Sequence, residues 1–187
     1  MKTIAIIQAR IGSTRLRGKS LMMLSNYSLL ETVVRSVKRN TYISKVIVAT
    51  SNLPEDDAIQ ELCLDKGFEC YRGDSLDVLS RFISVAETLE KEDTIVRVTA
   101  DNPINNHKAS KRVFDRHIEN NNDYTCVSGL SHIVYEFIKV EALLKLKNVK
   151  DLMADDREHV TMYLRQRPEV FRISEIDPDS LGLNSDL

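Results

Sequence analysis

The stretch "TIAIIQARIGSTRLRGKSL", residues 3–21, joins a continuous apolar run to a basic loop that contains two glycines. The run at 3–8 predicts a strand buried on both faces, because its apolar residues are consecutive rather than alternating with polar ones. Similar Val- and Ile-rich runs follow at 45–50 and 94–99, separated by segments in which apolar residues recur at helical spacing. This alternation is typical of a mostly parallel central sheet with helices on both faces. We therefore expect residues 1–187 to form a single α/β domain.

Apolar spacing also predicts individual elements further along the chain. A helix is expected to begin at Asp74 or Ser75, with Leu76 on its apolar stripe. The later predicted elements are a strand at 132–138, a helix at 156–166 and a last strand at 170–174.

The overall charge excludes some classes of partner. The chain has 26 Lys and Arg against 28 Asp and Glu, a net charge of -2. This balance gives no general attraction to nucleic acid or to an anionic membrane, so any polyanion must find a local basic site. Polar Gln8 and Arg10 cut short the apolar start, and no apolar run reaches the roughly 18 residues of a membrane span. We expect a cytoplasmic protein that binds neither nucleic acid nor membrane.

The loop at 9–21 has the composition of such a local basic site. Its cations are Arg10, Arg15, Arg17 and Lys19. Ligands of open parallel sheets bind outside the carboxyl ends of the strands, which is where this loop begins. Small residues Ala9, Gly12 and Ser13 allow backbone amides to approach a ligand, and the cations match the charge of a triphosphate. The alternative is a solvated loop that follows an edge strand.

The same loop nearly matches the phosphate-binding loop of P-loop proteins. That motif has four residues between its first glycine and its Gly-Lys pair, whereas five intervene between Gly12 and Gly18. A further segment at 20–28 separates Lys19 from the first strongly periodic helix, so phosphates would not rest on a helix N-terminus. The spacing therefore argues against a P-loop protein.

Two other strand ends carry polar residues. Asp101 follows the strand at 94–99, and a carboxylate there suits a hard divalent cation, although Asp-Asn-Pro is equally ordinary turn chemistry. The strand at 45–50 ends in Thr50, Ser51 and Asn52. These side chains either read the edge of a base or cap the next helix, and capping is the commoner role.

Several motifs, in order along the chain, resemble one family. The opening loop resembles the signature Q/P-A-R-x-x-S-T-R-L-P-G-K of nucleotidyltransferases that activate sugar acids with CTP. The other matching segments are "VIVATSNLPEDDAI", "RGDSLDVLSRF", "IVRVTADNPI" and "DREHVTMYLRQRPEVFRI". The chain is most similar to the spore-coat-polysaccharide branch of these cytidylyltransferases. This resemblance implies a Rossmann-like nucleotide-diphospho-sugar transferase fold.

The resemblance also implies roles for individual residues. The implied catalytic residues are Arg10, Lys19 and Asp101, and Asp101 would hold Mg²⁺. The candidate nucleotide-binding residues are Gln8, Ala9, Arg10, Gly12, Ser13, Arg15, Lys19, Thr50, Ser51, Asn52 and Arg81. Glu158 and His159 fall in the Glu-His-Val-Thr run of this branch, to which no role is assigned.

Two positions depart from the pattern of the family. Arg17 stands where the family has a proline before Gly-Lys. The family also has an L-x-L-x-x-D strand whose Asp is the second metal ligand. The segment "LGLNSDL" matches this pattern and places the second ligand at Asp186, although Asn184 and Ser185 are poor strand residues.

The activity that the resemblance implies is transfer of CMP from CTP to a sugar acid or related sugar, with release of pyrophosphate, for surface polysaccharide biosynthesis. The acceptor would contact residues between 125 and 170. A homodimer is also implied, and the strand at 132–138 either faces the partner or pairs within the sheet. Two alternatives remain: a nucleotide-binding homologue without turnover, and a glycosyltransferase of the same fold. The latter typically has Asp-x-Asp, and Pro103 replaces its second acid.

Overall fold

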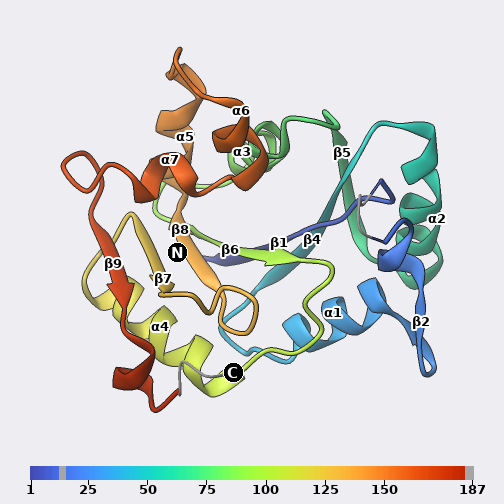
Figure 1. Ribbon diagram of the computed structural model, residues 1–187, viewed down its shortest axis with the longest axis horizontal. Coiled ribbons are helices and arrows are strands. Elements are labelled where there is room, and N and C mark those ends of the chain that lie inside the picture. The colour runs from blue at the N-terminus through green and yellow to red at the C-terminus, as the bar shows by residue number, and fades with distance from the viewer. Residues whose placement is uncertain (13–15, 184–187) are drawn as a thin grey trace.

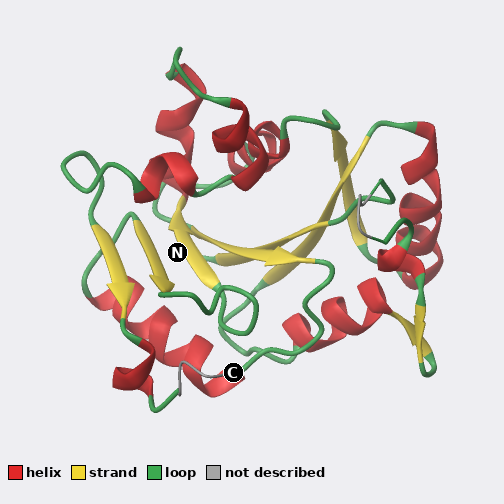
Figure 2. Ribbon diagram, viewed as in Figure 1, coloured by secondary structure: helices red, strands yellow, loops and turns green. Residues whose placement is uncertain are grey.

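Strand β1 (Thr3–Gln8) lies in the middle of a seven-stranded sheet in the computed structural model, which describes residues 1–12 and 16–183 (Figures 1 and 2). The strand order is β5-β4-β1-β6-β8-β7-β9. The other strands are β4 (Lys45–Ser51), β5 (Glu69–Gly73), β6 (Thr94–Thr99), β7 (Tyr124–Val127), β8 (Glu136–Lys139) and β9 (Ile173–Ile176). Only β8 runs antiparallel to its neighbours β6 and β7 in this described sheet. The predicted mostly parallel α/β fold is confirmed.

Both faces of β1 are buried, as its sequence predicts. Ile4 and Ile6 point to one apolar layer, and Ala5 and Ile7 point to the other. Parallel pairing with β4 and β6 continues to the end of the strand, where Gln8 lies level with Ala49 and Thr99. Because the three strands end together, the loops that follow them meet at one edge of the sheet.

Helices cover both faces of the sheet (Figure 1). Helices α1 (Leu29–Lys38), α2 (Asp57–Lys66) and α4 (His107–Glu119) contribute to the apolar layer that contains Ile7. The opposite layer is formed by α3 (Val78–Ala86), α5 (Val140–Lys145) and residues of α7 (Met162–Arg165), and α6 (Ala154–His159) packs against α3. The short elements are β2 (Met23–Leu24), β3 (Tyr27–Ser28) and 3-10 turns at Lys19–Leu21, Pro54–Asp56, Leu146–Asn148 and Pro178–Leu181.

The predicted start of the third helix is wrong by a few residues. Helix α3 begins at Val78, because the side chain of Asp77 caps it by accepting the amide hydrogen of Ser80. Asp74 instead accepts the amides of Leu76 and Asp77, which makes a separate turn before the helix. Leu76 is consequently 80% exposed rather than part of the apolar stripe.

Three predicted elements in the last third of the chain also differ from the structure. The strand expected at 132–138 is a turn that becomes strand β8 only at Glu136, inside the sheet between β6 and β7. The helix expected at 156–166 is two helices, because Val160 has a φ of 60° and interrupts the helical backbone. The last strand lies at Ile173–Ile176 rather than at 170–174.

Among the helices of the described residues, none has the length and apolarity needed to cross a membrane. The expectation of one domain over residues 1–187 stays a prediction, since 13–15 and 184–187 fall outside the described residues.

Protonation of His117 is predicted to destabilise the fold in mild acid. His117 is buried under the sheet with its Nδ1 2.9 Å from Thr125 Oγ1, and burial lowers its pKa to about 4. A depressed histidine pKa means that the unfolded chain binds more protons between about pH 6.5 and pH 4. The free energy of unfolding should therefore fall by roughly 2–3 kcal/mol across this window because of His117. Urea unfolding of the wild type and of H117Q at several pH values measures this contribution, and an unchanged pH dependence in H117Q would contradict it.

Candidate active site

A cavity of about 270 Å³ opens where β1 and β6 end. Six of the residues selected from the sequence line it, namely Gln8, Ala9, Arg10, Lys19, Arg81 and Asp101. Glu158 and His159, to which no role is assigned from the motif, form part of its wall. The cavity thus gathers side chains that are distant in the sequence and that come from the ends of β1, β6 and α6, from the turn at Lys19–Leu21 and from α3.

Hydrogen bonds donated by its backbone amides hold the loop after β1 in shape. Its Ile11 amide donates to Oδ1 of Asp56 at 2.6 Å, and the Gly18 amide donates to the Ile11 carbonyl at 2.9 Å. Gly18 has a φ of 73°, in the left-handed region that glycine occupies without steric cost. These contacts return the chain to the end of β1 and bring Lys19 to the cavity.

Carboxylates pair with two partly buried cations of the cavity. Lys19 Nζ lies 2.5 Å from Oδ2 of Asp101, and Arg10 Nη2 lies 3.3 Å from Oε1 of Glu158. Partial burial raises the pKa of Asp101, but the ammonium of Lys19, together with the Thr99 hydroxyl and a backbone amide, more than offsets this effect, so the pKa lies below its ordinary value. Asp101 is therefore an ionised carboxylate at neutral pH, as a metal ligand must be.

The inner wall of the cavity contains a buried polar atom without a protein partner. Arg81 is 2% exposed, and its Nη1 donates to the Ala49 carbonyl at 3.2 Å, while its Nε has no partner among the described residues. Buried polar atoms normally have partners, so this one indicates a place for a ligand atom or water.

Gly73 makes the room that Arg81 occupies. A Cβ at Gly73 would lie 2.8 Å from Cγ of Arg81 and 3.0 Å from Cε1 of Tyr71. Either contact is too close, so any larger residue would displace the guanidinium from the cavity wall.

The donor set of the cavity fits a magnesium ion. Within residues 1–12 and 16–183, no group of three or more His, Cys, Asp or Glu side chains is placed to hold a metal. Mg²⁺ does not need such a cage, because it binds through one or two carboxylates together with substrate phosphates and water. Asp101, in the lining of the cavity, has a carboxylate of the kind that such a site requires.

Several residues predicted from the sequence do not line the cavity. Gly12 is exposed beside Glu55, and Thr50 is fully buried with an unpartnered hydroxyl among the described residues. Ser51 donates its hydroxyl to Asp56, so it serves the local structure of the loops. The remaining predicted positions are Asn52, which is exposed, and Ser13, Arg15 and Asp186, which lie outside the described residues. Nucleotide or metal contacts of all these residues stay predictions.

Arg17, the departure from the family signature, is directed away from the cavity. Its Nη2 lies 2.6 Å from Oε2 of Glu55 on the surface, and its side chain is 74% exposed. The extra charge is thus neutralised locally rather than added to the cavity.

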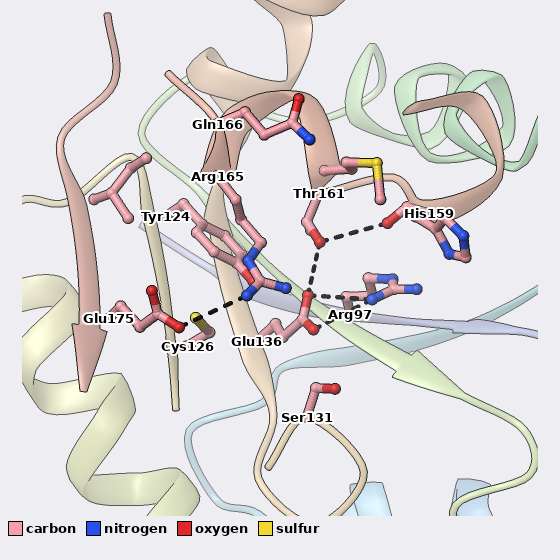
Figure 3. Close-up of a pocket in the computed structure, with 12 residues that line it drawn as sticks. Arg97, Tyr124, Cys126, Ser131, Glu136, His159, Thr161, Arg165, Gln166 and Glu175 are labelled. Atoms are coloured by element: carbon pink, nitrogen blue, oxygen red, sulfur yellow. Dashed lines mark hydrogen bonds and ion pairs between the residues drawn. The ribbon is translucent and has the colours of Figure 1, made fainter. Parts of the chain in front are cut away.

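A second, larger cavity of about 600 Å³, whose lining is drawn in Figure 3, shares His159 with the first. Arg97 on β6 faces Glu136 on β8, and its Nη1 lies 3.2 Å from both carboxylate oxygens. Arg97 Nε also donates to Gln8 Oε1 at 3.3 Å, which links this pair to the smaller cavity. Thr161 donates to Glu136 at 3.1 Å, and the buried hydroxyl of Tyr124 is unpartnered among the described residues.

Sequence reasoning missed the residues that organise these cavities. Asp56, which is not among the predicted site residues, joins the loop after β1 to the end of β4 by accepting the amides of Ile11 and Ser51. Arg97 and Glu136 each interrupt an otherwise apolar run, "TIVRVT" and "HIVYEFI". A charge inside a buried strand needs a partner, so this pattern was a usable signal for the pair.

The family model for cytidylyltransferases matches residues 4–181. The chain belongs to the cytidylyltransferase family. The match includes the whole of the smaller cavity's lining, from Gln8 to His159.

Individual proteins are similar to most of the chain. The uncharacterized protein MJ1063 of Methanocaldococcus jannaschii is 37% identical over 182 residues, which are 95% of this chain and 73% of that protein. The spore coat polysaccharide biosynthesis protein SpsF of Bacillus subtilis is 33% identical over 177 residues, 92% of this chain and 73% of SpsF. The 3-deoxy-manno-octulosonate cytidylyltransferase of Fusobacterium nucleatum is 25% identical over 167 residues, 88% of this chain and 64% of that enzyme.

A solved structure shows the same fold. A cytidylyltransferase from Leptospira borgpetersenii superposes with a TM-score of 0.84 at 26% identity, covering 95% of this chain and 76% of the other. The sheet and helices of this member of the family are therefore shared with a solved cytidylyltransferase.

Asp56 is predicted to hold the first loop of the site in place. Its buried carboxylate accepts the amides of Ile11 and Ser51, and D56A would leave these donors unpaired. The substitution should lower the free energy of unfolding by about 1–3 kcal/mol and speed hydrogen exchange at the Ile11 amide. Urea unfolding and exchange measured by NMR test both effects.

The neighbouring Asp57 provides the matched control. Its side chain is 56% exposed and pairs with Arg72 at the surface, at 2.6 Å. Because exposed pairs contribute at most about 1 kcal/mol, D57A should have a small effect on stability and none on Ile11 exchange. Equal effects of D56A and D57A would contradict the structural role of Asp56.

Proposed function

We propose that the protein transfers CMP from CTP to a hydroxyl of a sugar acid and releases pyrophosphate. The observation that carries this proposal is the gathering of Arg10, Lys19, Arg81 and Asp101 around one cavity, in a chain of the cytidylyltransferase family. Three cations around a cavity in a protein of net charge -2 match a polyanionic nucleotide.

The triphosphate of CTP would lie against Arg10 and Lys19. Each of these cations already has a carboxylate partner, Glu158 and Asp101 respectively. Phosphate oxygens would replace these carboxylates as partners, which frees Asp101 to act as a metal ligand. The cations would then stabilise the negative charge that develops on the departing pyrophosphate.

Mg²⁺ is the metal that we propose for Asp101. When bound, it would supply positive charge to the phosphates at the bond that breaks. The protein's own part is to present an ionised carboxylate next to Lys19, at the level where β1 and β6 end. Asp186 is the proposed second ligand.

The larger cavity is the proposed site of the acceptor. Its size, about 600 Å³, suits a sugar acid of eight or nine carbons, and Arg97 and Arg165 provide cations for the carboxylate. The relative from Fusobacterium nucleatum acts, by its name, on 3-deoxy-manno-octulosonate. SpsF is named for spore coat polysaccharide biosynthesis, and we propose surface polysaccharide biosynthesis for this protein as well.

Two further parts of the proposal concern the protein in the cell. We propose a cytoplasmic location, where CTP is available, and a homodimer. Strand β8 pairs with β6 on one side and with β7 on the other, so its backbone is not available to pair with a strand of a second subunit.

A pyrophosphate-release assay tests the proposed activity. The wild type is incubated with Mg²⁺, one of the four nucleoside triphosphates, and a panel of octulosonic and nonulosonic acids. We expect release with CTP and at least one acid. K19Q should lower kcat by about 10²–10³-fold, because one preorganised charge is lost where negative charge develops.

Lys45 is the control for Lys19. It is an exposed lysine paired with Glu69 at the opposite end of β4, so K45Q should retain wild-type turnover. CTP binding by calorimetry without pyrophosphate release from any acid would favour the non-catalytic alternative. Full turnover by K19Q would contradict the role given to the cavity.

A further inference from the structure

His159 stands at the junction of the two cavities. Among the described residues, it is the one that lines both the smaller cavity beside Lys19 and Asp101 and the larger cavity beside Arg97 and Glu136. A nucleotide in the first cavity and an acceptor in the second would meet at this side chain.

The backbone holds His159 at the junction from both sides. Helix α6 ends at His159, and the next residue, Val160, is buried in the core with a φ of 60°. A β-branched residue rarely adopts this backbone conformation, so packing of Val160 must maintain it. On the far side, Thr161 is anchored to Glu136 by a hydrogen bond of 3.1 Å.

The imidazole of His159 is free to act on a ligand. Its side chain is exposed, and its ring nitrogens have no hydrogen-bond partner among the described residues. By contrast, the ring of His107 contacts Asn40 and that of His117 contacts Thr125. Figure 3 shows the His159 ring projecting from the end of its helix on the same side as Arg97.

The acidic side chains near the junction are already engaged. Glu158 pairs with Arg10, Asp101 pairs with Lys19, and Glu136 is buried against Arg97. Glu175, in the larger cavity, accepts the hydroxyl of Ser128 at 2.6 Å. CTP would free Glu158 from Arg10, but Glu158 lines only the smaller cavity. His159 is thus the unengaged base that, among the described residues, lines both cavities, and imidazole is the usual general base near pH 7.

We propose that His159 takes the proton of the acceptor hydroxyl during CMP transfer, an inference that rests on the proposed function. The O–H bond breaks and its proton moves to a ring nitrogen of His159. The hydroxyl oxygen forms a bond to the α-phosphorus of CTP, and the bond from this phosphorus to the bridging oxygen breaks. Its electron pair leaves with pyrophosphate, and the imidazolium returns the proton to water.

Three variants test this role. H159Q removes the base and retains a polar side chain, H159A allows rescue by added imidazole, and H132Q changes an exposed histidine that lines neither cavity. Pyrophosphate release gives kcat and KM, calorimetry gives CTP affinity, and urea unfolding gives stability. For H159Q we expect kcat to fall by about 10²–10⁴-fold, with CTP affinity and stability unchanged. Imidazole should restore part of the H159A rate, and H132Q should match the wild type.

The outcomes separate this proposal from the proposed function. If the wild type releases pyrophosphate and H159Q releases it at a similar rate, the role of His159 is overturned and the proposed function stands. A loss in H159Q that is explained by weaker CTP binding also overturns it. A wild type that turns over no acceptor overturns the proposed function together with this inference.

Discussion

The parallel pairing of β1 with β6 is the constraint on which the site depends. The register places Gln8 level with Thr99, and the ladder continues one residue further, where the Ala100 amide donates to the Gln8 carbonyl at 3.0 Å. Both strands are buried on both faces, so a slip of one residue would turn apolar side chains into the wrong layer. The fixed register brings the loop with Lys19 and the loop with Asp101 to one edge of the sheet. There Lys19 Nζ lies 2.5 Å from Oδ2 of Asp101.

Charge balance within the protein explains how a mildly acidic chain keeps a cationic cavity. Arg10 and Lys19 are each paired with a carboxylate that also lines the cavity, Glu158 and Asp101 respectively. In the larger cavity, Arg97 and Glu136 form a nearly buried pair with side chains 14% and 4% exposed. Removing one member of such a pair would leave an uncompensated buried charge, so neither residue can be replaced alone without a cost in stability.

The first half of the fold follows from the sequence because its signals are local. Continuous apolar runs mark β1, β4 and β6, and Gly67 ends α2 in the left-handed conformation, as its position after Lys66 predicts. The composition of the loop with Arg10 and Lys19, which has several cations and no acids, indicates a binding site for an anion. The parallel topology predicts that this loop lies at the edge of the sheet where ligands bind. The family signature adds Arg81, which no local pattern indicates.

The last third is predicted less well because its structure depends on tertiary contacts. Val160 breaks a helix in spite of favourable periodicity, and only the packing of its side chain in the core explains this. The segment at 132–135 is a turn although its residues favour a strand, since the Tyr135 amide donates to Ser110 of α4 rather than to a neighbouring strand. The position of His159 at the end of α6 depends on the same break in the helix. The sequence therefore contains no signal for this position beyond the Glu-His-Val-Thr motif.

The position of the bond that breaks tests the central claim most directly. CTP is labelled in one sample at the α-phosphorus and in another at the γ-phosphorus, and the products are separated after reaction with Mg²⁺ and an accepted sugar acid. Transfer of CMP predicts the α label in the sugar product and the γ label in pyrophosphate. Movement of the γ label to the sugar, with the α label left in CDP, would show a kinase and contradict the account.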